Sequence, residues 1–340
     1  MQPEERLKTT IAAMVDEHRG ILAADESLPT MAKRLAAIGL PSTEENRRAW
    51  RSLLVSTPGL GDYICGIILF EETLEQTTED GIPIPEAAIR QGIVPGIKVD
   101  KGKGPLSGAP GDLITRGLDD LSERLDTYQK RGARFAKWRE VYPITPNNPT
   151  LLGLKSNAEV LARYAAVCQE LGMVPIVEPE VLMDGNHDID RCATVTEAVL
   201  HEVFDALHLH HVQLEYMLLK PNMVLPGKGC RQAPPDEVAQ ATLEVFMRVV
   251  PAAVPSINFL SGGQGPEEAT ANLNAINRRR GRAPWQLSIS YGRALQQPAL
   301  QAWQGKVENR EVAQHALLKR AKLNSLARQG TYDPAMEAQD

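Results

Sequence analysis

The sequence has no long apolar run. Its longest candidate, residues 63–70, is strand-sized, whereas a membrane-spanning helix needs roughly 18 consecutive apolar residues. The first residues, Met1-Gln2-Pro3-Glu4-Glu5, carry neither the basic nor the apolar stretch of a secretory leader. An Arg- and Ser-rich transit peptide is also missing. We therefore expect a cytoplasmic chain with no membrane partner.

Cysteine is scarce and scattered. The four cysteines, Cys65, Cys168, Cys192 and Cys230, form no C-x-x-C pair, which indicates a reduced chain in which they are packing residues. A basic excess is missing as well, because 37 Lys and Arg face 43 Asp and Glu, a formal net charge of −6. This balance argues against a surface that binds nucleic acid or anionic lipid as a whole. We expect no nucleic-acid partner.

Cofactor and metal motifs are missing too. There is no G-x-x-x-x-G-K-[ST] phosphate loop, and Gly263–Glu268 fails the dinucleotide pattern G-x-G-x-x-G because its sixth residue is glutamate. Residues 201–205 fail the H-E-x-x-H motif at the last position. His208, His210 and His211 end a predicted helix, where a solvated terminus is favoured over a metal site. We expect neither a cofactor nor a metal.

His187 and the basic run 278–282 each have a structural and a functional interpretation. His187 follows the fifth predicted strand, where a turn role is favoured over contact with a ligand. The basic run Arg278–Arg282 favours a solvated loop over a site for an anionic partner.

What the chain does have is eight short apolar, β-branched runs. Their starts lie 29 to 45 residues apart, which is the spacing of a strand–helix repeat. The intervening segments 158–172, 195–207 and 235–250 have the apolar spacing of amphipathic helices. Although 340 residues favour about two domains by length alone, an eightfold repeat favours a single (β/α)8 TIM barrel, with an open doubly wound sheet as the alternative. The runs are residues 20–25, 65–70, 94–99, 135–139, 175–181, 216–223, 256–262 and 286–292.

Two segments flank the repeat. Residues 1–19 are expected to form an N-terminal helix, and residues 298–330 a C-terminal helical extension. The barrel itself would span about residues 20–297, all within one domain of residues 1–340. The last ten residues, 331–340, have almost no apolar content, so we expect a short mobile tail.

Charged side chains recur where the predicted strands end. In a barrel these ends form one mouth, which carries the chemistry. Residues two apart on a strand share a face, so Lys137 with Arg139, and Glu178 with Glu180, would point the same way. Buried charge is costly unless it is paired or functional, and charge on most of the strands indicates a site. The strand-end residues are Asp25, Lys98, Asp100, Lys137, Arg139, Glu178, Glu180, Lys220, Ser261-Gly262-Gly263 and Ser290-Tyr291-Gly292-Arg293.

This set indicates a particular chemistry. Burial and mutual repulsion favour the neutral form of one of several clustered lysines, and a neutral buried amine attacks carbonyl groups to form a Schiff base. Neighbouring carboxylates would move the protons. The glycine turn at 261–263 and Gly292-Arg293 suit a phosphate, which barrel enzymes often bind after strands seven and eight. The residues thus predict a Schiff-base lyase or transferase acting on a phosphorylated carbonyl compound.

At these residues the chain resembles the class I fructose-1,6-bisphosphate aldolases. Eight segments, in family order from about residue 4 to residue 333, carry the resemblance. They are Gly20-Ile-Leu-Ala-Ala-Asp-Glu-Ser27, Thr43-Glu-Glu-Asn-Arg-Arg48, Gly96-Ile-Lys-Val-Asp-Lys-Gly102, Phe135-Ala-Lys-Trp-Arg139, Ile176-Val-Glu-Pro-Glu180, Leu218-Leu-Lys-Pro-Asn-Met223, Phe259-Leu-Ser-Gly-Gly-Gln264 and Ser290-Tyr-Gly-Arg-Ala-Leu295.

The resemblance implies reversible cleavage of fructose 1,6-bisphosphate to dihydroxyacetone phosphate and glyceraldehyde 3-phosphate, in glycolysis and gluconeogenesis, without a metal or cofactor. It also implies a homotetramer. The catalytic roles that it implies are the Schiff base on Lys220, its neighbour Lys137, the acid/base Glu178, the adjacent carboxylate Glu180, and Asp25 as base for the C4 hydroxyl. The implied phosphate contacts are Ser261, Gly262, Gly292 and Arg293 at one end, and Ser27, Arg34 and Lys98 at the other, with Arg139 nearby.

Two departures from the animal pattern are visible. Leu28-Pro29-Thr30 replaces Thr-Gly-Ser, so Thr30 keeps a hydroxyl for the phosphate. Animal members end in a tyrosine that assists proton exchange on the enamine, whereas the last tyrosine here, Tyr332, aligns upstream of that position. We therefore expect another group to move that proton, or a slower step. Preference for another substrate such as sedoheptulose 1,7-bisphosphate, or a non-catalytic scaffold on the same fold, are the alternatives.

Overall fold

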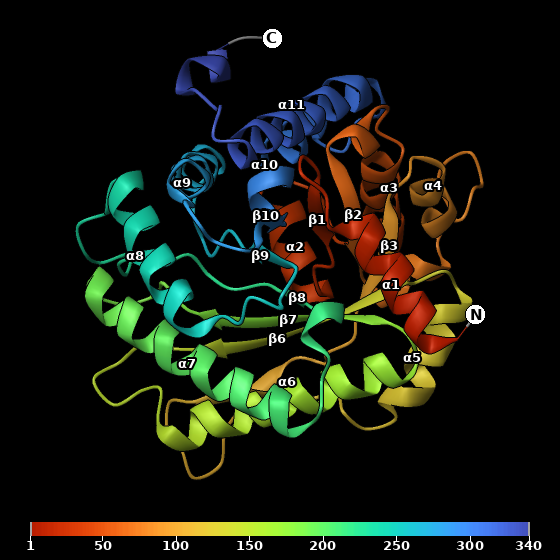
Figure 1. Ribbon diagram of the computed structural model, residues 1–340. Helices are drawn as coiled ribbons and strands as arrows, with labels where there is room; N and C mark the ends of the chain where they lie inside the picture. Colours follow the sequence, from red (N-terminus) through yellow and green to blue (C-terminus); the bar gives the residue numbers. More distant parts are fainter. Residues whose placement is uncertain (1, 339–340) are drawn as a thin grey trace.

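The computed structural model describes residues 2–338, and its centre is a closed barrel of eight parallel strands (Figure 1). Around the barrel the strands lie in the order β1-β10-β9-β8-β7-β6-β3-β2. The predicted TIM barrel is confirmed, and the open sheet was the wrong alternative. The strands are β1 (Gly20–Ala24), β2 (Ile64–Leu69), β3 (Val94–Lys98), β6 (Phe135–Tyr142), β7 (Val174–Val181), β8 (Leu218–Leu219), β9 (Ser256–Phe259) and β10 (Gln286–Tyr291).

Parallel strands covered on both faces are apolar along their length, and β1, β2 and β9 are buried at every residue. The charged residues are exceptions that the strand register brings together. Lys98 pairs with Lys137 across β3 and β6, and Arg139 pairs with Glu178 across β6 and β7. The register therefore places Lys98 beside Lys137 and, two residues further along β6, Arg139 beside Glu178.

The helices form the outer ring, as expected for a (β/α)8 fold (Figure 1). Predicted helices 158–172, 195–207 and 235–250 correspond to observed helices that begin earlier or at the same residue. Threonine and aspartate set two of these starts, because Thr150 accepts a hydrogen bond from the Gly153 amide and Asp188 from the Arg191 amide. The ring comprises α2 (Leu28–Ala36), α3 (Glu44–Val55), α4 (Ile84–Arg90), α5 (Leu121–Lys130), α6 (Leu151–Glu170), α7 (Ile189–Leu209), α8 (Pro235–Val249), α9 (Pro266–Arg279) and α10 (Arg293–Trp303).

Helical segments flank the barrel at both ends of the chain, as the sequence predicts. The first, α1 (Pro3–Met14), packs Leu7 and Met14 against residues of the barrel strands such as Ile21 and Phe135. Near the other terminus α11 (Arg310–Arg328) lies along α9 and α10 (Figure 1). Short 3-10 helices complete the fold: η1 (Leu60–Asp62), η2 (Glu71–Glu75), η3 (Leu214–Tyr216), η4 (Val307–Asn309) and η5 (Pro334–Ala338).

Residues 331–338, which the sequence leads us to expect as a mobile tail, contact the body of the protein. Tyr332 is buried, and its hydroxyl hydrogen-bonds Glu337, which also pairs with Arg320 of α11. These polar contacts, which the apolar count of the tail does not reveal, hold this segment against the body of the protein. The rest of the expected tail, residues 339–340, lies outside the described residues.

Two strand features differ from the sequence interpretation. The predicted strand 216–223 contains only two strand residues, since Pro221 has no amide hydrogen to continue the ladder. A hairpin of β4 (Lys103–Pro105) and β5 (Leu113–Thr115) was missed because its strands are too short for a periodic pattern. This hairpin lies between β3 and β6 in the chain, close to the mouth of the barrel.

Candidate active site

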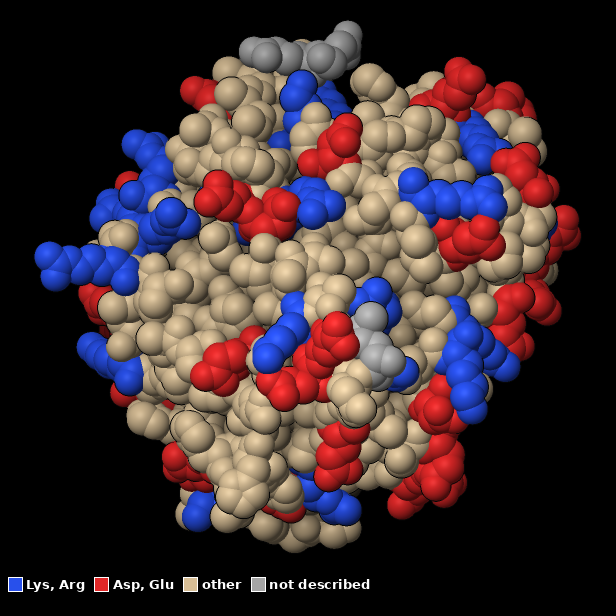
Figure 2. All heavy atoms as spheres, turned by 45° about the vertical axis from the view of Figure 1, so that its right-hand side comes forward, with Lys and Arg blue, Asp and Glu red and all other residues tan. Residues whose placement is uncertain are grey.

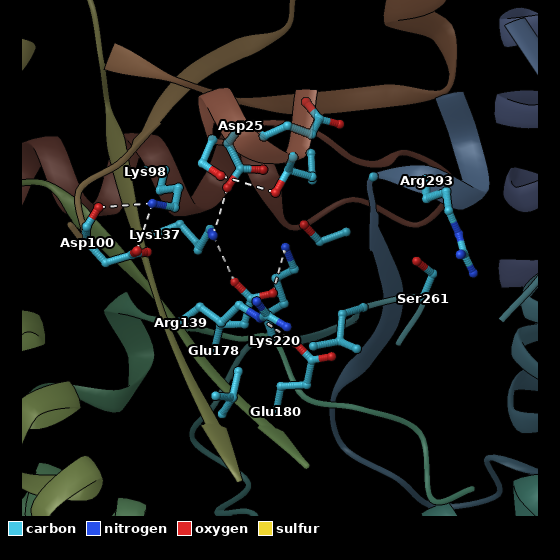
Figure 3. A pocket seen from close by; sticks show the side chains of 18 of the residues that line it. Asp25, Lys98, Asp100, Lys137, Arg139, Glu178, Glu180, Lys220, Ser261 and Arg293 are labelled. Atoms are coloured by element: carbon cyan, nitrogen blue, oxygen red, sulfur yellow. Dashed lines mark hydrogen bonds and ion pairs between the residues drawn. The ribbon is translucent and has the colours of Figure 1, made fainter. Parts of the chain in front are cut away.

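The thirteen predicted site residues all line one cavity of about 510 Å³ at the carboxyl ends of the barrel strands (Figure 3). Its size lies within the range of small-molecule sites, roughly 300–1,000 Å³. The strands are far apart in sequence, and barrel closure brings their ends together. The predicted residues are Asp25, Ser27, Arg34, Lys98, Lys137, Arg139, Glu178, Glu180, Lys220, Ser261, Gly262, Gly292 and Arg293.

A buried chain of alternating charge occupies the centre of the cavity. The Lys220 ammonium lies 3.1 Å from one oxygen of Glu178, and the Lys137 ammonium lies 3.1 Å from the other. Lys137 also contacts Asp25 at 2.7 Å. The side chains of both lysines are only 4% exposed. Glu178 therefore bridges two lysines, and within residues 2–338 only Lys137 contacts a second carboxylate (Figure 3).

The charges of this chain hold one another in their ionised forms. Burial alone would lower the pKa of Lys137, but the carboxylates of Asp25 and Glu178 outweigh burial and raise that pKa well above its ordinary value. Burial would likewise raise the pKa of Asp25 and Glu178, but Lys137 and Lys220 bring both below their usual range. Lys137 is thus a fixed cation, and Asp25 and Glu178 are proton acceptors at neutral pH.

Two further ion pairs flank the central chain. Arg139 pairs with Glu180 at 2.5 Å, and this carboxylate offsets burial and raises the pKa of Arg139 above its ordinary value. On the β3 side, the Lys98 ammonium lies 2.7 Å from an Asp100 carboxylate oxygen and donates to the Asp100 carbonyl at 3.0 Å. Both cations have a protein partner and still line the cavity.

Backbone conformation builds an anion site where β9 and β10 end. Gly262 and Gly263 have φ of 58° and 99°, a left-handed region that suits glycine, and they turn the chain after Ser261. Helix α10 begins beside them at Arg293, so its free amide groups face the same end of the cavity. The Arg293 guanidinium donates to the Gly263 carbonyl and, at 3.0 Å, to the Gln264 carbonyl. It braces the glycine turn in this arrangement.

On the β1 side, hydroxyl groups and an ion-pair network follow the strand. The Ser27 and Thr30 hydroxyls lie 3.1 Å apart, and both residues line the cavity, which agrees with the position expected for Thr30. Arg34 pairs with the buried Glu26, whose other oxygen contacts Arg51 at 2.7 Å. Glu26 therefore positions Arg34 at the mouth.

Sequence reasoning missed three polar side chains that line the cavity. Glu26 was treated only as part of a motif, although its acidic position next to Asp25 was a usable signal. Lys103 and Thr115 also line the cavity, and both come from the unpredicted hairpin. No pattern in the sequence placed that hairpin over the mouth.

The features set aside as structural lie elsewhere. His210 contacts Glu159 at 2.9 Å just after α7 ends, and His187 is buried without lining the cavity. The run Arg278–Arg282 is exposed at every residue, and Arg279 pairs with Asp236. Across residues 2–338, no group of three or more His, Cys, Asp or Glu side chains could hold a metal ion. Nor is any helix in this span long and apolar enough to cross a membrane.

The mouth differs in charge from the rest of the molecule. Seven cationic and five acidic side chains line it, an excess of two positive charges in a chain of net charge −6. On the face shown in Figure 2, basic and acidic side chains are interspersed. A buried lysine amine beside a single carboxylate, together with a surplus of cations, suits carbonyl chemistry on an anionic substrate.

Comparison with known proteins agrees with this geometry. A family model described as class I fructose-bisphosphate aldolase, of the glycolytic type, matches residues 6–340. The cytoplasmic fructose-bisphosphate aldolase isozyme of Cicer arietinum is 56% identical over 92% of this chain and 88% of its own length. Fructose-bisphosphate aldolase C of Pan troglodytes is 52% identical over 99% of this chain and 93% of its own.

A solved structure is similar over nearly the whole fold. Fructose-bisphosphate aldolase from Plasmodium falciparum, in complex with TRAP and a small-molecule inhibitor, superimposes with a TM-score of 0.95 at 49% sequence identity. The match covers 97% of this chain and 96% of that one. The barrel and its flanking helices are therefore similar to those of an aldolase.

Proposed function

The chain belongs to the class I fructose-bisphosphate aldolase family, and from this premise we propose how its own residues cleave fructose 1,6-bisphosphate reversibly through a Schiff base on Lys220. The observation that carries the assignment is the chain of contacts Lys220–Glu178–Lys137–Asp25. Of the two central lysines, Lys220 contacts one carboxylate oxygen and Lys137 contacts two. Lys220 is therefore the amine that is easier to free for attack.

The first steps use Glu178. The Lys220 amine attacks C2 of the ketose after its proton has left, and the Glu178 oxygen 3.1 Å away is placed to accept that proton. Attack yields a carbinolamine, whose hydroxyl leaves as water when it receives a proton. Glu178 returns the proton for this step, and Lys137 keeps the carboxylate in place through its other oxygen.

The cleavage step uses Asp25. The protonated imine draws the electrons of the C3–C4 bond towards nitrogen, while Asp25 takes the proton from the C4 hydroxyl. Glyceraldehyde 3-phosphate leaves, an enamine remains, and protonation at C3 followed by hydrolysis releases dihydroxyacetone phosphate. The lowered pKa of Asp25 keeps it ionised for this role, and Glu180 fixes Arg139 beside the reacting carbons.

The two phosphates bind at separate places in the cavity. C1 is adjacent to the imine carbon, and β9 is the strand next to the Lys220 strand. The C1 phosphate thus occupies the site of Ser261, Gly262, Gly292 and Arg293. The C6 phosphate lies four carbons from the imine, towards Ser27, Arg34 and Lys98, with the Thr30 hydroxyl available beside Ser27.

Borohydride trapping tests the assignment. Reduction in the presence of dihydroxyacetone phosphate should fix an adduct that peptide mass mapping places on Lys220, and Lys220→Met should abolish it. Lys98→Met is the matched control, because Lys98 lies in the same cavity with its own carboxylate partner. An adduct on another lysine in the parent chain would overturn the Schiff-base assignment. Loss of activity on EDTA treatment would point to a metal-dependent reaction.

We also propose that the protein is a cytoplasmic homotetramer. Leu209 of α7 and Met247 of α8, on neighbouring helices, are 73% and 54% exposed, and large apolar side chains of this kind are typical of subunit contacts. The cytoplasmic relative from Cicer arietinum supports the location. Sedimentation equilibrium measures the mass in solution, and a monomer at micromolar concentration would contradict the tetramer.

A further inference from the structure

The β4–β5 hairpin adds a cation to the mouth that no motif predicted. Lys103, the first residue of β4, lines the cavity together with Lys98 and Arg139. It follows Lys98 by five residues, and the hairpin turns it back over the carboxyl end of the barrel. Lys103 pairs in register with Thr115 of β5, which lines the same cavity.

The hairpin is held to the barrel by contacts of its second strand, β5. The Thr115 amide donates to Glu140 at 3.0 Å, and the Thr115 hydroxyl donates to the Arg139 carbonyl at 2.8 Å. Glu140 is fully buried in β6 and accepts its other hydrogen bond from Trp138 at 2.9 Å. A carboxylate that accepts a hydrogen bond on each oxygen is fixed in position, so Glu140 holds the strand that faces Lys103.

The position of the hairpin around the barrel decides which part of a substrate it meets. In the ring of eight strands, β3 lies opposite β9, and β6 lies opposite β10. Lys103 follows β3, and its hairpin is bonded to β6. It therefore sits across the mouth from the glycine turn after β9 and the start of α10, where the C1 phosphate binds.

The charges around Lys103 leave its ammonium group available. Lys98 pairs with Asp100, Lys101 with Glu71 and Arg139 with Glu180, whereas Lys103 has no carboxylate partner within the part of the chain described. Partial burial and the nearby positive charge of Arg139 lower the pKa of Lys103. An unpaired ammonium next to a guanidinium is stabilised by a dianionic group placed between them.

We propose that Lys103 binds the C6 phosphate of fructose 1,6-bisphosphate, and that Glu140 is a positioning residue which places Lys103 through Thr115. This inference rests on the proposed function, since it takes the imine to form on Lys220. It adds Lys103 to the C6-phosphate contacts that the sequence motifs predict, which are Ser27, Arg34 and Lys98 with Arg139 nearby.

The test compares a bisphosphate with a monophosphate. Fructose 1-phosphate keeps the C1 phosphate and the reacting carbons but lacks the C6 phosphate. Lys103→Met should raise the KM for fructose 1,6-bisphosphate by roughly fivefold, the scale of one charge-assisted contact at a partly exposed site. Its kcat, and both constants for fructose 1-phosphate, should stay within about twofold of the parent.

Lys101→Met is the matched control. It removes the same charge two residues away, from an exposed side chain that does not line the cavity, and it should leave both substrates unaffected. If Lys103→Met alters neither KM, or raises the KM of both substrates equally, the inference is wrong. Adduct formation on Lys220 in the parent chain is measured separately, so failure of the inference is distinguishable from failure of the proposed function.

A double-mutant cycle tests the role of Glu140. A glutamine side chain keeps the shape of glutamate but has one accepting oxygen, so it satisfies Trp138 or Thr115 and not both. Glu140→Gln should raise the KM for the bisphosphate by about two- to threefold, with no change for fructose 1-phosphate. Added to Lys103→Met, it should cause no further rise. Additive losses, or equal effects on both substrates, would show that Glu140 does not act through Lys103.

Discussion

Lys137 and Lys220 are equally buried, and what distinguishes them is the number of carboxylate oxygens that each contacts. Among the described residues, Lys137 contacts the carboxylates of Asp25 and Glu178, and Lys220 contacts that of Glu178 alone. A buried ammonium with two anionic partners is costly to deprotonate. The contacts therefore identify Lys220 as the nucleophile and Lys137 as the fixed cation. Residue type alone does not distinguish the two lysines.

Replacing Asp25 by asparagine should separate imine formation from carbon–carbon cleavage. The amide keeps the size of the side chain but cannot take the C4 hydroxyl proton, so kcat for cleavage should fall by roughly 10²–10⁴. Glu178 still faces Lys220, so borohydride trapping with dihydroxyacetone phosphate should continue at a similar level. If this variant loses trapping while its melting temperature is unchanged, Asp25 acts in imine formation and not in cleavage.

Tyr332 should not act in the proton transfer at C3. Its hydroxyl hydrogen-bonds Glu337 at 2.9 Å, and Tyr332 does not line the active-site cavity. Tyr332→Phe should leave hydrogen exchange at C3 of dihydroxyacetone phosphate within about twofold of the parent, relative to the cleavage rate. Deletion of residues 331–340 is a less clean test because it also removes the Arg320–Glu337 pair. A tenfold loss of exchange in the phenylalanine variant would refute this prediction.

At the scale of elements, the barrel strands were predictable from the sequence. The β4–β5 hairpin and the ion pairs around the mouth were not. Eight apolar runs required eight buried strands, and barrel closure then forced Lys98, Lys137 and Lys220 into one mouth. The β4–β5 hairpin escaped prediction because three-residue strands have no measurable period. The ion pair of Arg34 with Glu26 was not predicted either, because no local sequence pattern shows that Glu26 contacts both Arg34 and Arg51.

The buried Glu140 carboxyl, which joins β6 to Thr115 of β5, should make the stability of the protein depend on pH. Burial raises the pKa of Glu140 to about 7, despite the hydrogen bonds from Trp138 and Thr115, whereas an unfolded glutamate titrates near about 4.3. Between these values the folded state binds more protons than the unfolded state, so this residue's contribution to stability falls as pH rises from 5 towards 7. The decrease is at most about 3 kcal/mol.

Urea unfolding at several pH values checks this sign. The free energy of unfolding of Glu140→Gln, minus that of the parent, should increase from about pH 5 to pH 7.5 and then level off. Taking the difference at each pH cancels the other titrating groups, His187 among them, whose pKa burial lowers. A difference that stays constant across this range would mean that Glu140 is ionised at pH 5 and that its hydrogen bonds outweigh burial.

At the scale of the whole molecule, a chain of net charge −6 must admit a substrate with two phosphates. The seven cationic and five acidic side chains of the mouth give it the opposite sign. At about 0.1 M salt the Debye length is roughly 10 Å, so most surface charge is screened from the mouth while its own charges act within a few ångströms. The local excess therefore outweighs the net charge of the chain.

Salt should weaken binding in proportion to the number of phosphates. Raising KCl from about 0.1 to 0.5 M should increase the KM for fructose 1,6-bisphosphate by roughly three- to fivefold, because screening reduces attraction at both ends of the cavity. Fructose 1-phosphate engages one end only, so its KM should rise less, and kcat should stay nearly constant for both substrates. KM values that do not change, or that fall as salt rises, would mean that the acidic surface and not the basic mouth governs the approach of substrate.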